Sequence, residues 1–151
     1  MEVSPLMSQM MSEEKTCLSN LARMVFESFA HVPVTEELLR HVWEGEPNGH
    51  QGGHRSGLGR EGKTEFPAHW TPDIVENAIR TILEKPQFVG HYGNDIVLGS
   101  NFRGIMVVVK LKMRRNHLFI DSAFPDSGPG VVRNDRGVPR EIPLNNYILE
   151  A

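Results

Sequence analysis

The hydrophobic pattern of the chain changes its period partway along the sequence. Over residues 18–29 apolar side chains recur every three or four positions, which is the spacing of one helix face. A second helix is expected to begin after Thr35, a favourable N-cap residue. A third is expected to have Thr71 as its cap and Pro72 at its first position, and to end before Pro86. The first part of the chain therefore predicts helices.

The second part of the chain is rich in β-branched residues. Runs typical of strands cover residues 96–98, 105–113 and 117–122, and the polar residues 114–116 join the last two into an expected hairpin. Residues 128–143 contain several glycines and prolines, which favour turns and short edge strands. Helices followed by strands predict an α+β fold, in which N-terminal helices pack on a C-terminal antiparallel β-sheet.

Length and composition limit the classes of protein that need to be considered. The 151 residues suit a single domain over 1–151. The longest apolar run, Ile105–Val109, is far too short to span a bilayer, and the first thirty residues have no apolar core of the kind that a signal sequence needs. Cys17 is the only cysteine, so we expect no internal disulfide and no thiolate metal cluster. We therefore expect a soluble chain that does not bind membranes and has no export signal of its own.

Charge is distributed unevenly along the chain. The formal net charge is −3, which argues against a protein that holds nucleic acid over its whole surface. Residues 1–50 carry −5, however, and residues 101–151 carry +3. The last third could therefore supply a local cationic site, which is enough for an enzyme that contacts a few phosphates.

Glycine is concentrated in one segment. Seven of the fourteen glycines lie between Gly45 and Gly62, and residues 44–65 have no apolar periodicity. A loop of about twenty residues in a compact domain is usually functional or disordered. Glycines also allow the backbone to approach a ligand closely, so this loop is the first place to look for a site.

Two histidines thirteen positions apart mark this region. His41 lies near the end of the second expected helix, and His54 lies inside the glycine-rich loop. Imidazoles can accept and return a proton near neutral pH, and cleavage of RNA by an adjacent ribose hydroxyl needs one group of each kind. The histidines could also be purely structural, and a zinc site with His41, His50 and His54 stays open. The spacing from Gly57 to Gly62-Lys63-Thr64 fits a phosphate-binding loop of the Walker type, but that loop needs a strand before it and a helix directly after it, and neither is expected here.

Several short motifs occur together around these histidines. His41 is followed by glycine four positions later, and the run Gly52-Gly53-His54-Arg55 continues to Gly59. Gly62-Lys63-Thr64-Glu65-Phe66-Pro67 follows, and Ser122-Ala123-Phe124-Pro125 ends the last expected strand. Together these motifs resemble the bacterial EndoU nuclease domain, the C-terminal toxin of CdiA-type contact-dependent growth inhibition proteins. The resemblance covers residues 38–125, and residues 1–37 would be a helical N-terminal extension or subdomain.

The resemblance implies a fold of the barnase–EndoU–colicin–RelE type and a metal-independent endoribonuclease without a cofactor. The expected reaction cuts RNA next to uridine, in tRNA, and leaves a 2′,3′-cyclic phosphate and a 5′-hydroxyl. By this resemblance His54 matches the general base and His41 the general acid. Ser122 matches a hydroxyl residue that contacts the phosphate or the uracil edge, and its hydroxyl can both donate and accept.

Other residues of the matched region are expected to bind substrate. Phe124 stands where many relatives have a base-stacking tyrosine, and it keeps the ring without the hydroxyl. Lys63 is the first candidate for a lysine that neutralises phosphate charge and Lys110 the second, while Arg55 is an expected phosphate contact. Strict strand alternation would turn Ser122 towards the core, so presenting it to substrate requires a bend or bulge.

The resemblance also implies partners and a place of action. Such domains are delivered as part of a larger secreted or cell-surface toxin, act in the cytoplasm of the target cell and are neutralised by a cognate immunity protein. A different class of function remains open from the residues themselves. On the same scaffold the chain could be a non-catalytic RNA- or protein-binding module.

Overall fold

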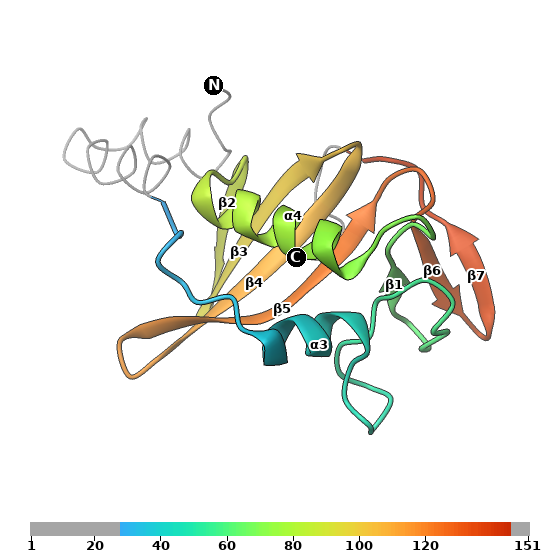
Figure 1. The fold of residues 1–151 in the computed structure, drawn as a ribbon, viewed down its shortest axis with the longest axis horizontal. Helices are drawn as coiled ribbons and strands as arrows, with labels where there is room; N and C mark the ends of the chain where they lie inside the picture. Colours follow the sequence, from blue (N-terminus) through green and yellow to red (C-terminus); the bar gives the residue numbers. More distant parts are fainter. Residues whose placement is uncertain (1–27, 146–151) are drawn as a thin grey trace.

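The computed structural model describes residues 28–145, and in that range two helices accompany two antiparallel sheets (Figure 1). The larger sheet has the order β2-β3-β4-β5, with strands β2 (Phe88–Tyr92), β3 (Asp95–Phe102), β4 (Ile105–Arg114) and β5 (His117–Ser127). The smaller sheet has the order β1-β6-β7, with strands β1 (Thr64–Glu65), β6 (Val132–Asp135) and β7 (Val138–Glu141). The predicted α+β class is confirmed.

Both helices begin where their caps predict. The Oγ1 atom of Thr35 accepts from the backbone N–H of Leu38 at 3.1 Å and starts α3 (Glu36–Trp43). Thr71 caps α4 (Pro72–Glu84) in the same way. The helix expected over residues 18–29 lies outside the described residues, except for its last two positions, which are not helical.

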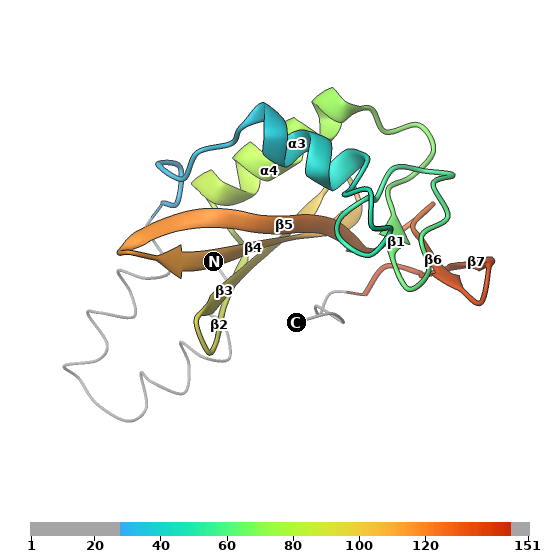
Figure 2. The ribbon, with the colours of Figure 1, turned by 90° about the horizontal axis from the view of Figure 1, so that it is seen from below.

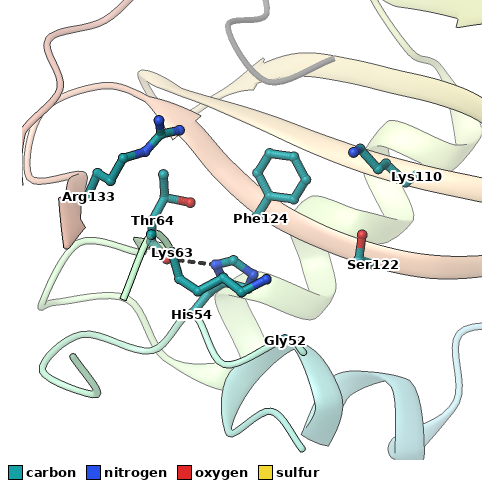
Figure 3. A pocket seen from close by; sticks show the side chains of 9 residues that line it. Gly52, His54, Lys63, Thr64, Lys110, Ser122, Phe124 and Arg133 are labelled. Atoms are coloured by element: carbon teal, nitrogen blue, oxygen red, sulfur yellow. Dashed lines mark hydrogen bonds between the residues drawn. The ribbon is translucent and has the colours of Figure 1, made fainter. Parts of the chain in front are cut away.

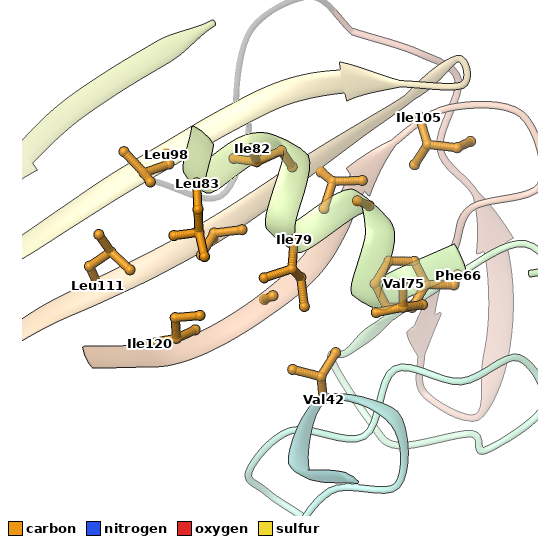
Figure 4. Packing of buried hydrophobic residues seen from close by; sticks show 14 of the residues in the cluster. Val42, Phe66, Val75, Ile79, Ile82, Leu83, Leu98, Ile105, Leu111 and Ile120 are labelled. Atoms are coloured by element: carbon orange, nitrogen blue, oxygen red, sulfur yellow. The ribbon is translucent and has the colours of Figure 1, made fainter. Parts of the chain in front are cut away.

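The core lies between α4 and the larger sheet. α3 and α4 both lie on one side of this sheet (Figure 2). Figure 4 shows Ile79, Ile82 and Leu83 of α4 facing the sheet, and each of them is at most 1% exposed. Because a buried aliphatic side chain contributes about 1.5–3 kcal/mol, this one face accounts for much of the attachment of the helix. None of the helices between residues 28 and 145 is long and apolar enough to cross a membrane.

The hairpin of β4 and β5 contains a bulge beside Ser122. Leu111 is paired with Ile120 but Lys110 with Ser122, so Asp121 is an extra residue in β5. Ile120 therefore belongs to the core under the helices, whereas Ser122 and Phe124 project from the other face of the sheet. A bulge is therefore present beside Ser122, as its exposure on this face requires.

Strand β1 connects the glycine-rich segment to the C-terminal part of the chain. Thr64 is paired with Arg133 and Glu65 with Val132 of β6. The strand has only two residues, so its local sequence carries almost no strand signal. The pairing nevertheless places residues 62–65 beside residues 132–134, far away in the sequence.

Candidate functional site

The glycine-rich segment is held to the end of α3 by consecutive backbone hydrogen bonds. The N–H groups of residues 53, 54 and 55 donate to the carbonyl oxygens of His41, Val42 and Trp43 at 3.0, 2.8 and 3.1 Å. These carbonyls belong to the last turn of the helix, where no backbone N–H of the helix is available to donate to them. The arrangement fixes His54 relative to His41, although thirteen residues separate them.

Gly52 makes this close approach possible. Its φ is +67°, and a Cβ atom there would lie 2.2 Å from the carbonyl oxygen of His41 and 3.0 Å from its Nε2. Any side chain would therefore collide with the backbone of His41. Gly52 also places the Nε2 edge of His41 beside the pocket described below, because Gly52 is part of the pocket wall.

His54 is buried, and its tautomer is fixed by the structure. The side chain is only 5% exposed, and Nδ1 lies 2.6 Å from the carbonyl oxygen of Thr64. Because a carbonyl can only accept, Nδ1 carries the proton and Nε2 keeps its lone pair. Burial lowers the pKa of His54 to about 4, with smaller contributions from nearby cations such as Lys63, so the ring is neutral at pH 7. A neutral imidazole with an unprotonated Nε2 is the form that a general base requires.

Phe124 forms one wall of the His54 environment. The two rings are stacked with centroids 5.8 Å apart and planes inclined by 29°. The ammonium group of Lys110 lies 5.6 Å from the centroid of the Phe124 ring, within reach of a cation–π interaction. Lys110 and Ser122 are directly opposite each other on β4 and β5, so both side chains lie on the same face as Phe124.

A pocket of about 190 Å³ opens over this group (Figure 3). Its wall contains three cationic side chains, from Lys63, Lys110 and Arg133, together with His54 and the hydroxyl residues Ser122 and Thr64. Among the residues that the structure describes, no carboxylate contributes to this wall. The charge of the pocket therefore suits an anionic ligand such as a phosphodiester.

His41 lies between this pocket and a second one of about 330 Å³. Its Nδ1 lies 2.9 Å from Oε1 of Glu46, and this hydrogen bond is the largest of the effects that lower the pKa of Glu46. The ionised carboxylate accepts, so Nδ1 donates and Nε2 points to the Gly52 side. An imidazolium held in this way could deliver the proton on Nε2 to a departing oxygen.

Buried Glu65 holds the glycine-rich segment in shape, a role that the sequence did not reveal. Its carboxylate accepts from the backbone N–H groups of Gly57 and Gly59 at 2.9 and 2.7 Å, and from the side-chain amide of Asn134 at 2.8 Å. These bonds connect the segment to β6. Because both glycine donors belong to irregular backbone, no periodicity in the sequence could have pointed to Glu65.

The structure brings most of the predicted site residues together. His54, Ser122, Lys63, Lys110 and Phe124 all line the first pocket, and His41 lies beside it. Arg55 does not line either pocket, and its Nε donates to both carboxylate oxygens of Glu44 at 3.2 and 3.1 Å. The sequence did not single out Thr64 or Arg133 as binding residues.

The alternative zinc site does not assemble in the described part of the chain. Between residues 28 and 145 no three histidine, cysteine or acidic side chains are arranged so that they could hold a metal ion. His50 is exposed, whereas His54 is buried and uses Nδ1 for Thr64.

Comparison of the chain with protein families, with curated proteins and with solved structures finds no match in any of the three.

Proposed function

We propose that this protein is a metal-independent endoribonuclease of the EndoU type that cleaves RNA at uridine, with tRNA as its substrate. The observation that carries the proposal is the state of His54. A neutral ring whose Nδ1–H is bonded to Thr64 keeps the lone pair of Nε2, and the residue lines a pocket of cationic character. This combination supports proton abstraction beside a phosphate better than it supports a structural role.

The proposed reaction is an internal transesterification. Nε2 of His54 takes the proton of the ribose 2′-hydroxyl, and the 2′-oxygen attacks the adjacent phosphorus. The bond from phosphorus to the 5′-oxygen breaks, and His41 gives a proton to that oxygen. The products are a 2′,3′-cyclic phosphate and a 5′-hydroxyl. Each proton-transfer group of this kind typically contributes about 10²–10⁴-fold to the rate.

Three further side chains have proposed roles in substrate binding. Lys63 and Lys110 neutralise the phosphate charge that increases during the attack. The Ser122 hydroxyl contacts the phosphate or the uracil edge, and the bulge at Asp121 turns it towards the substrate. Arg55 is not included, because it lies outside the pocket and is paired with Glu44.

The biological setting is part of the same proposal. The domain would reach a target cell within a larger secreted or cell-surface toxin, act on tRNA in its cytoplasm and be blocked in the producing cell by an immunity protein. Expression without an inhibitor should then stop growth of the host, and expression of the His41→Ala variant should not. Equal growth with both chains would contradict this setting.

Purified protein provides the decisive test. Wild type, His41→Ala and His54→Asn are incubated with total tRNA in EDTA, and the RNA ends are identified. Asparagine keeps a donor near the position of Nδ1, so His54→Asn removes the base while the bond to Thr64 can persist. We expect cyclic phosphate ends from wild type and about 10²–10⁴-fold less cleavage by either variant.

Two results would overturn the mechanism. One is a wild type that requires a divalent metal, and the other is a folded variant that cuts at the wild-type rate. If the wild type binds RNA without cutting it, the chain is a binding module on the same scaffold. Circular dichroism of each variant shows whether a loss of activity reflects unfolding.

A further inference from the structure

The hydroxyl of Thr64 is a buried polar group that the fold itself does not use. Thr64 is 3% exposed, and its Oγ1 atom has no hydrogen-bond partner among the described residues. Its carbonyl oxygen is occupied by His54, so the backbone of Thr64 has a structural role that the side chain lacks. Buried hydroxyls are nearly always hydrogen-bonded, and an exception in a pocket wall indicates a missing partner.

Thr64 and Arg133 lie at one end of the first pocket. Figure 3 shows them on one side of the His54–Phe124 pair and Lys110 with Ser122 on the other. Thr64 and Arg133 are directly opposite each other on β1 and β6, so both side chains project from the same face of the smaller sheet. The pocket therefore has two polar ends, separated by the proposed base and the ring stacked on it.

The chemistry of this end suits a phosphate. A threonine hydroxyl can donate to a phosphate oxygen, and the guanidinium of Arg133 matches phosphate geometry. An anion reaches the Thr64 oxygen only after a shift of its neighbours, because the oxygen is covered in the structure. Lys63 and Arg133 are both half-buried rather than packed in the core, so a modest change of side-chain position is feasible.

We propose that Thr64 and Arg133 bind a second phosphate of the RNA strand, next to the phosphate that is cleaved. The inference rests on the proposed function for the identity of the ligand. It adds that the minimal efficient substrate is longer than two nucleosides joined by one phosphate. The Thr64 hydroxyl then has its partner in the complex, which accounts for a hydroxyl at this buried position.

Substrate analogues that cannot be cleaved test this inference by binding alone. The 2′-deoxy dinucleotide dUpdA carries one phosphate, and pdUpdA and dUpdAp carry a second one at the 5′ or 3′ end. Dissociation constants are measured by calorimetry for wild type, Thr64→Val and Thr64→Ser. Valine has nearly the shape of threonine without the hydroxyl, and serine keeps the hydroxyl.

We expect wild type to bind one of the two longer analogues about tenfold more tightly than dUpdA, because a hydrogen bond to a charged group is involved. Thr64→Val should lose that gain and bind dUpdA as wild type does, and Thr64→Ser should keep most of it. Arg133→Gln should also lose the gain, whereas the control Arg136→Gln removes an exposed arginine outside the pocket and should keep it.

The inference is overturned if wild type binds neither longer analogue more tightly than dUpdA. It is also overturned if Thr64→Val weakens the binding of all three analogues equally, or the binding of none of them. These outcomes are independent of the cleavage assay. Cleavage of tRNA without a phosphate-dependent gain leaves the proposed function intact and removes only the second phosphate site. A phosphate-dependent gain without cleavage leaves the site in place and removes the nuclease.

Discussion

The Nδ1–H of His54 donates to the carbonyl oxygen of Thr64 across 2.6 Å, and this bond links the glycine-rich segment to the first residue of β1. It orients the ring, determines which nitrogen carries the proton and leaves Nε2 for chemistry. Burial then keeps the ring neutral.

Stability should increase with pH between about 4 and 6.5 because of His54. The imidazole has a pKa near 6.5 in the unfolded chain and about 4 in the folded one, so between these values the unfolded state binds more protons. The full contribution is present above pH 6.5 and is lost as pH falls to 4, a total of about 3 kcal/mol. Urea unfolding at several pH values measures this slope.

The increase in the free energy of unfolding between pH 4 and 6.5 should be smaller in His54→Asn by the contribution of this imidazole. In His91→Asn it should stay as in wild type, because His91 is exposed. A slope that is identical in all three chains would show that His54 does not titrate in this way.

The pH profile of cleavage should reflect the same pKa. A base with a pKa of about 4 stays deprotonated in mildly acidic solution, so the acidic limb of kcat/KM should lie near pH 4 rather than near 6.5. The measurement is initial cleavage rates of a short uridine-containing oligoribonucleotide from pH 4 to 8, with folding checked at each pH. A half-maximal kcat/KM near pH 6.5 on the acidic side would exclude His54 as the base in this environment.

Gly52→Ala should damage the site more than Gly57→Ala does. Both glycines have positive φ, +67° and +85°, so alanine costs about 1–2 kcal/mol of backbone strain at either position. Only at Gly52 does the added Cβ meet His41, whereas nothing lies within 4 Å of the corresponding atom at Gly57. We expect Gly52→Ala to lower kcat/KM by about 10²-fold through displacement of His41.

Gly57→Ala serves as the matched control and should keep most of the activity while losing some stability. Melting temperatures and cleavage rates of the two variants separate the effect of backbone strain from the effect of the contact between the added Cβ atom and His41. Equal losses of activity in both variants would mean that the contact between Gly52 and His41 is not what matters.

Thr64→Val should stabilise the protein. The substitution removes a buried hydroxyl that has no partner among the described residues, with little change in shape. We expect a gain of about 1 kcal/mol, which is about 3 °C in Tm for a chain of this size. Differential scanning calorimetry measures it.

Thr71→Val is the contrasting variant, because the Thr71 hydroxyl accepts from the N–H of Ile74 at the start of α4. The same chemical change should there cost about 1 kcal/mol. A decrease in Tm for Thr64→Val as large as that for Thr71→Val would show that the Thr64 hydroxyl is satisfied within the fold.

Local signals in the sequence were sufficient for the helices and the hairpin. Thr35 and Thr71 cap α3 and α4 because a cap acts on residues two or three positions away, and β4 and β5 are joined by a polar turn of two residues between Arg114 and His117. The two histidines were also identified from their local context. In contrast, β1 and its pairing with β6 were not predicted, because a two-residue strand has no pattern of its own.

The sequence alone therefore determined the α+β class, the starts of α3 and α4 and the choice of His41 and His54 as candidates. Only the tertiary structure decided the protonation of His54, the placement of Arg55 outside the pocket and the meeting of Thr64 with Arg133. The physical reason is the range of the interactions. Caps, turns and periodicity act between near neighbours, whereas burial and strand pairing depend on residues that only the folded chain brings together.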